Sequence, residues 1–206
     1  MNELLTKVIS AFMAQSILEI VAVICAVLYL VLVVRENIWC WFFAFVSTAL
    51  FIYLFHSVAL LSESVLNIYY LIMAVYGWMQ WRSKGEKKEL SIQNWSFKSH
   101  GVILLFSIIL TPIIGYLMAS LGAAFPYLDT FVAILSVVAT IMVAKKVFEN
   151  WYYWLVIDTI SIYLFWQKQL YFVAALYVIY IVLIFVGIKA WRRTLNFQSS
   201  SPHLRQ

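Results

Sequence analysis

Residues 41–55 of this chain read WFFAFVSTALFIYLF, and residues 151–165 read WYYWLVIDTISIYLF. The match runs without a gap from Trp41 and Trp151 to Arg82 and Arg192, with 12 identities in 42 pairs at an offset of 110. An apolar composition raises the number of chance matches between aliphatic residues, but it does not align glycines, tryptophans and charges. The sequence therefore predicts a duplicated unit.

The composition indicates that much of the chain faces lipid. Of its 206 residues, 65% are hydrophobic and 11% are charged, and the mean hydropathy is +0.93. A soluble domain carries about 25% charged residues, and a chain of this length cannot bury so much apolar surface inside itself. The net charge of +5 comes from basic residues between apolar runs. Such charges set membrane topology, so no nucleic-acid partner is expected.

Seven segments are long and apolar enough to cross a membrane, which takes about 20 residues. No segment alternates between polar and apolar residues, and an odd number of spans does not suit a bacterial barrel. The sequence predicts an all-α integral membrane protein with seven transmembrane helices. They cover residues 15–34, 37–56, 60–81, 101–121, 126–144, 148–167 and 170–191.

The basic residues predict the orientation. With seven spans, 12 of the 14 Lys and Arg residues fall on one side, and Lys7 and Lys168 fall on the other. The positive-inside rule then places the C-terminus in the cytoplasm and the N-terminus outside.

The duplication and the span count together predict a 3+1+3 layout. Three helices are an odd number, so a fourth helix between the copies is needed to give both the same orientation. Parallel repeats of this kind occur in transporters that hold a substrate near the membrane midplane. The predicted parts are an outer segment (1–14), repeat 1 (15–82), a basic loop with a linker helix (83–124), repeat 2 (125–192) and a cytoplasmic tail (193–206), disordered from Asn196.

One helix face carries the strongest functional signal. Trp151, Trp154, Asp158 and Ser161 are spaced so that they share a face. A carboxylate near the middle of a span is costly and usually functional, and indoles attract cations. We predict a site for a flat, positively charged ring. The alternatives are an aromatic belt, which fits Trp151 better than Trp154, and a structural hydrogen bond for Asp158.

Other polar side chains at mid-span depth are candidates for the same site. Each alone is equally consistent with a hydrogen bond between helices. Glu19 and Asp129, matched near the outer ends of their helices, suggest scaffold pairing instead, with tyrosines as candidate partners. The further site candidates are Ser47, Thr48, Asn67, Tyr70, Tyr177 and Tyr180.

No signature of catalysis, of a metal site or of a cofactor is found. The chain has no GxxxxGK[ST] motif, its three histidines are scattered, and Cys25 and Cys40 form no ligand pattern. A membrane enzyme acting on lipid would have Asp158 with Ser161 as its one candidate centre. The sequence favours a transporter over an enzyme.

Two motifs resemble the PnuC family of vitamin transporters. Glu149-Asn150-Trp151-Tyr152-Tyr153-Trp154 followed by Asp158 resembles the WxxW signature of that family. Tyr76-Gly77-Trp78 with Trp81 resembles its YGWxxW motif, and Glu19 and Asp129 match its acidic positions. The resemblance covers residues 15–192.

The resemblance implies a homotrimer in the bacterial inner membrane, with a layout similar to that of the SWEET sugar carriers. It also implies facilitated diffusion of an unphosphorylated vitamin precursor, most often nicotinamide riboside, which a separate cytoplasmic kinase then traps. Relatives carry thiamine or riboflavin.

The chain departs from the nicotinamide riboside pattern at two positions. Ser47 and Asn67 stand where those members usually have Asn and Gln, so thiamine stays an alternative substrate. Both vitamins are cationic and suit Asp158, whereas neutral riboflavin suits it less. A binding subunit of an energy-coupled vitamin importer is a further alternative.

Overall fold

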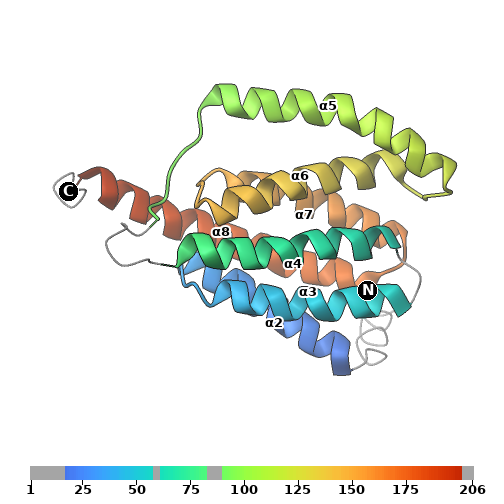
Figure 1. The fold of residues 1–206 in the computed structure, drawn as a ribbon, viewed down its shortest axis with the longest axis horizontal. Helices are drawn as coiled ribbons and strands as arrows, with labels where there is room; N and C mark the ends of the chain where they lie inside the picture. The colour runs from blue at the N-terminus through green and yellow to red at the C-terminus, as the bar shows by residue number, and fades with distance from the viewer. Residues whose placement is uncertain (1–16, 58–60, 83–89, 201–206) are drawn as a thin grey trace, which may run out of the picture.

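The computed structural model describes residues 17–57, 61–82 and 90–200, and these are helical apart from their connections (Figure 1). The predicted outer segment lies outside the described residues. An isolated bridge between Gln93 and Val147 is the one β contact in the described part of the chain. The seven helices are α2 (Ile17–Val34), α3 (Cys40–Ser57), α4 (Leu61–Trp81), α5 (Phe97–Ser120), α6 (Pro126–Ala144), α7 (Asn150–Gln167) and α8 (Tyr171–Ser200).

The helix bounds agree with the predicted segments except at α5 and α8. Helix α5 starts at Phe97 because the Ser96 hydroxyl caps it, accepting a hydrogen bond from the Ser99 N–H. The prediction of a disordered tail from Asn196 is wrong as far as Ser200, because α8 continues through it. Arg, Leu and Gln are good helix formers, so the helix outlasts its apolar run.

Six helices form a closed ring. Helix α2 packs on α3 and α8, α3 on α4, α4 on α6, α6 on α7, and α7 on α8. Helix α5 lies outside the ring along α6 (Figure 1). In the same view, α2, α4, α6 and α8 run one way and α3, α5 and α7 run the other. The triplet α2–α3–α4 and the triplet α6–α7–α8 therefore have the same sense.

The outer surface of the bundle is apolar. Helices α2, α5, α6 and most of α8 are long and apolar enough to cross a membrane. On α5, Ile108, Ile109 and Ile113 are each at least half exposed. An apolar surface of this extent along parallel helices is the surface that a multi-pass membrane protein presents to lipid.

Paired glycines and tryptophans pack in the same way in both triplets. The Trp41 ring lies flat against Gly77, and the Trp151 ring lies against Gly187, so that a Cβ at either glycine would overlap the indole. The four positions match in pairs at the offset of 110. Equal residues therefore make equal contacts in the two halves.

Trp81, the last residue of α4, and Trp191 of α8 join the two triplets reciprocally. Trp81 and Trp191 each meet the buried tryptophan of their own triplet edge-on, with centroids 5.5 and 5.4 Å apart. The Trp81 Nε1–H donates to the Ala144 carbonyl at the end of α6 (3.1 Å). The Trp191 Nε1–H donates to the Val33 carbonyl at the end of α2 (3.0 Å).

The segment before α5 docks on the turn between α6 and α7. The Gln93 N–H donates to the Lys146 carbonyl (3.0 Å), and the Phe148 N–H donates to the Gln93 carbonyl (2.8 Å). The Gln93 side chain donates to the Lys145 carbonyl. Nothing in the sequence indicated this contact, which fixes the part of the predicted basic loop that the structure describes.

Candidate substrate-binding site

Asp158 lies in the middle of α7 and is 3% exposed. It takes part in neither of two ion pairs in the described chain, Glu36–Lys146 and Asp129–Lys168. Among the described residues, no Lys or Arg lies close enough to act on it electrostatically. A charged carboxylate in such a place is costly unless another group compensates it. Its position therefore suits a cationic ligand or a proton.

Tyrosines from α4 and α8 lie within electrostatic range of this carboxylate. They are Tyr70, Tyr177 and Tyr180. Ser161, one turn further along α7, is buried beside Tyr177. The three tyrosines are only partly buried. The structure thus brings five predicted site residues together.

Two members of this group were not predicted from the sequence. Ser136 of α6 is buried beside the Tyr70 hydroxyl, and Tyr29 of α2 lies near Tyr70 and Tyr180. Each is a single polar side chain within an apolar run. That isolation was the one feature of the sequence that could have identified them as site residues. Alanines stand at both equivalent positions in the other repeat, so comparing the repeats does not reveal them.

Five of the six ring helices contribute to this site, all but α3. A carboxylate and several aromatic rings can hold a flat cation through charge and cation–π attraction, and hydroxyls can exchange hydrogen bonds with polar groups of a ligand. In the described part of the chain, no group of three or more His, Cys, Asp or Glu side chains is placed to hold a metal ion.

The two tryptophans of the predicted site face differ in position. Trp151 has no exposed surface and packs between Gly187 and Trp191, so it presents nothing to a ligand in this conformation. Trp154, one turn before Asp158, is partly buried and packs against the interior of α6 and α7. Their contacts with a substrate stay predictions.

The predicted residues of α3 make hydrogen bonds within the scaffold. The Ser47 hydroxyl donates to the Ala22 carbonyl of α2 (2.9 Å), which joins two helices. The Thr48 hydroxyl donates to the Ala44 carbonyl of its own helix (2.8 Å). Asn67 is buried on α4, one turn before the site tyrosine of that helix. A role for these three in substrate binding remains a proposal.

The scaffold pairing expected for Asp129 is present, but with a different partner. Its carboxylate accepts hydrogen bonds from the Lys168 ammonium at 3.0 and 3.1 Å. This ion pair joins the start of α6 to the end of α7, instead of the tyrosine contact considered from the sequence.

Comparison with known proteins decides the family. A protein family described as nicotinamide mononucleotide transporter matches residues 16–193. The chain belongs to this family. The resemblance to PnuC proteins is thereby confirmed, the protein is a multi-pass membrane transporter, and the alternative of an enzyme is set aside.

Individual relatives agree with this assignment. The nicotinamide riboside transporter PnuC of Escherichia coli is 26% identical, with 87% of this chain and 85% of that protein aligned. The riboflavin/roseoflavin transporter RibM of Streptomyces davaonensis is 23% identical, with 84% and 83% aligned. A crystal structure of the vitamin B3 transporter PnuC has the same fold, with a TM-score of 0.72, 23% identity, and 94% and 90% of the two chains covered.

Proposed function

We propose that this PnuC-family protein carries an unphosphorylated cationic vitamin precursor by facilitated diffusion, with nicotinamide riboside as the first candidate. The observation that carries the proposal is the buried carboxylate of Asp158, which lacks a cationic partner among the described residues. A pyridinium ring would supply the missing charge, and the tyrosines beside it would supply π faces. The hydroxyls would bond to the sugar.

Thiamine is the alternative substrate, because its thiazolium ring also carries a positive charge. Ser47 and Asn67 have shorter polar groups than the Asn and Gln expected from the family pattern, which leaves room for a different ring. The similarity to RibM makes riboflavin the third compound to compare. Riboflavin has no positive charge, so Asp158 disfavours it.

The transport path is proposed to run between two parallel three-helix repeats, residues 15–82 and 125–192, joined through the linker helix α5. The matched Gly–Trp packing and the reciprocal tryptophan hydrogen bonds support this 3+1+3 layout. In the proposal all seven helices span the inner membrane, and the end of the bundle that carries Arg35, Lys145 and Arg192, here called the basic end, faces the cytoplasm. The N-terminus lies outside, and residues 193–206 lie in the cytoplasm.

Two further expectations come from the family. The protein would assemble as a homotrimer in the membrane, and a separate cytoplasmic kinase would trap the substrate, because a phosphorylated product no longer fits a site built for a cation. Neither assembly nor trapping needs a cofactor bound to this chain.

Uptake into proteoliposomes tests the proposed function. We expect the purified chain to take up labelled nicotinamide riboside saturably, without ATP, until the inside and outside concentrations are equal. Asp158→Asn should abolish most of this uptake, whereas Asp129→Asn, the matched control outside the site, should keep it.

The identity of the transported vitamin and the need for an ATPase distinguish the alternative functions. Preferred uptake of thiamine would reassign the substrate within the same class. A requirement for a copurified ATPase would indicate the importer subunit. Absence of saturable uptake of nicotinamide riboside, thiamine and riboflavin would overturn the proposal.

A further inference from the structure

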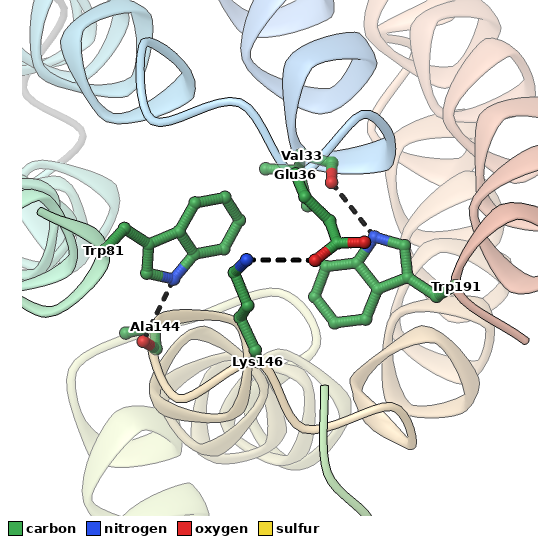
Figure 2. Close-up of polar contacts among 6 residues, drawn as sticks. All are labelled: Val33, Glu36, Trp81, Ala144, Lys146 and Trp191. Carbon is green, nitrogen blue, oxygen red and sulfur yellow. Dashed lines mark hydrogen bonds and ion pairs between the residues drawn. The ribbon is translucent and has the colours of Figure 1, made fainter. Parts of the chain in front are cut away.

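An ion pair joins two positions that correspond to each other in the repeats. The Lys146 ammonium donates to a carboxylate oxygen of Glu36 at 2.9 Å, and the two residues are 110 apart in the chain (Figure 2). This separation is the offset of the repeat. A residue can touch its own equivalent only close to the axis that relates the two copies. The pair therefore lies at the centre of the basic end.

The backbone at both positions has the same unusual conformation. Glu36 has φ +53° and Lys146 has φ +51°, in the left-handed region that favours glycine. Each follows the end of a helix, and the helices close alike: the Asn37 N–H donates to the Leu32 carbonyl, and the Val147 N–H donates to the corresponding carbonyl of α6. Long charged side chains at both glycine-type positions indicate that the side chains themselves have a role.

Two indoles enclose this ion pair. The Lys146 ammonium lies 4.8 Å from the centre of the Trp81 ring, whose Nε1–H donates to the Ala144 carbonyl. On the other side, the Trp191 Nε1–H donates to the Val33 carbonyl (Figure 2). The charged side chains are only 12% and 21% exposed. All of these contacts join one triplet to the other, so they hold the basic end closed.

The opposite end is held differently. Among the residues that the structure describes, the ion pair at that end is between Asp129 and Lys168, and it joins α6 to α7 within one triplet. It can persist while the two triplets move relative to each other, whereas the pair between Glu36 and Lys146 cannot.

We infer that Glu36 and Lys146, with Trp81 and Trp191, form a latch on the axis between the repeats. The latch closes the path from the Asp158 site to the basic end, and it must open before a ligand leaves on that side. The inference rests on the proposed transport path between the triplets.

The pseudo-symmetry provides a sharp test by exchange of charges. Because the two positions share one backbone conformation and each follows a helix C-terminus, Glu36→Lys with Lys146→Glu should rebuild the pair. The ammonium would then lie beside Trp191, the equivalent of Trp81. Loss of either charge alone should weaken the latch, and the double exchange should restore it.

Labelling of a reporter cysteine measures closure without any substrate. The reporter is Ser136→Cys, buried beside Tyr70 in the site, in a chain with Cys25→Ala and Cys40→Ala. A membrane-impermeant maleimide is applied to sealed vesicles that expose the basic end. We expect Glu36→Gln and Lys146→Gln to speed labelling about fivefold, the shift produced by loss of a partly exposed ion pair, and the charge exchange to return it to the parent rate.

Two controls keep the result interpretable. Asp129→Asn, which breaks the ion pair with Lys168 at the opposite end, should leave labelling from the basic end unchanged. The double variant Glu36→Gly with Lys146→Gly removes both charges and relieves the left-handed backbone, so it should stay folded and label as fast as the single variants.

The outcomes separate this inference from the proposed function. The latch is overturned if the parent and the charge-removing variants are labelled at the same rate. It is also overturned if none of them is labelled. A charge exchange that labels as fast as the single variants would also overturn it. Because no vitamin is present, failure of nicotinamide riboside uptake leaves this test unaffected, and failure of the latch leaves the uptake result standing.

Discussion

At the scale of single residues, the absence of a side chain at two glycines shapes both triplets. Gly77 and Gly187 allow an indole to lie directly on the backbone of α4 and α8. In a close-packed interior, an added methyl group must displace its neighbours. A rigid indole, itself packed against a second tryptophan, can give little room.

We predict that Gly77→Ala and Gly187→Ala each destabilise the protein by about 1–3 kcal/mol through overpacking. Gly101→Ala is the matched control, because a Cβ there meets no atom within 4 Å, and alanine favours helix. Thermal unfolding in detergent, followed by tryptophan fluorescence, should show lower transitions for the first two and not for the third. Equal transitions in all three variants would contradict the packing argument.

The candidate site residues that the structure brings together are polar groups near the middle of their predicted spans. Asp158 was chosen because a charged group in the middle of a span is costly. Tyr70 was chosen with Asn67 as a polar pair on one helix, and Tyr177 and Tyr180 as the repeat equivalents of that pair. Trp151 was included because its spacing places it on the same face, but seven residues of helix separate it from Asp158 by about 10 Å along the axis. Helical periodicity predicts the face of a side chain and says nothing of its depth.

At the scale of helices, three helix ends in the described part of the chain adopt the left-handed conformation without glycine. One of them is Gln169, with φ +60°, where the Leu170 N–H donates to the Phe165 carbonyl and closes α7. Gly122 closes α5 with φ +83°. The conformation strains a residue that has a Cβ and costs glycine nothing in steric terms.

We predict that Gln169→Gly raises the free energy of unfolding by about 0.5–1 kcal/mol, because it removes this strain. Gly122→Ala should lower it by about 1 kcal/mol for the opposite reason. Thermal or denaturant unfolding of the purified protein checks both. Shifts in the same direction for the two variants would show that backbone conformation does not decide these helix ends.

The sequence predicted the helix bounds well where the apolar run and the helix begin and end at the same residues. Hydropathy marks the apolar run, so it placed α6 at residues 126–144 as observed. It ended the last helix near residue 191, whereas α8 continues to Ser200, because leaving the membrane does not end a helix. Docking of Gln93 on the α6–α7 turn depends on tertiary contact and has no local signal.

At the scale of the whole molecule, one relation between distant segments organises the structure. Residues matched at an offset of 110 pack alike, and α4 meets α6 as α8 meets α2. The predicted repeat was visible in the sequence because glycines and tryptophans recur in pairs at this offset. The latch was not, because Glu36 aligned with Lys146 reads as a mismatch. The opposite charges at these equivalent positions attract each other because the two residues meet on the axis, where they join one triplet to the other.

The account's central claim is that the buried carboxylate of Asp158 selects a cationic ring. Nicotinamide riboside and its reduced form test this most directly, because they have nearly the same size and differ by the positive charge of the ring. Titration calorimetry should show that the parent protein prefers the oxidised, cationic form by at least about tenfold, or ~1.4 kcal/mol. Asp158→Asn should lose that preference while Asp129→Asn retains it. Equal binding of both forms by the parent, or an unchanged preference in Asp158→Asn, would contradict the account.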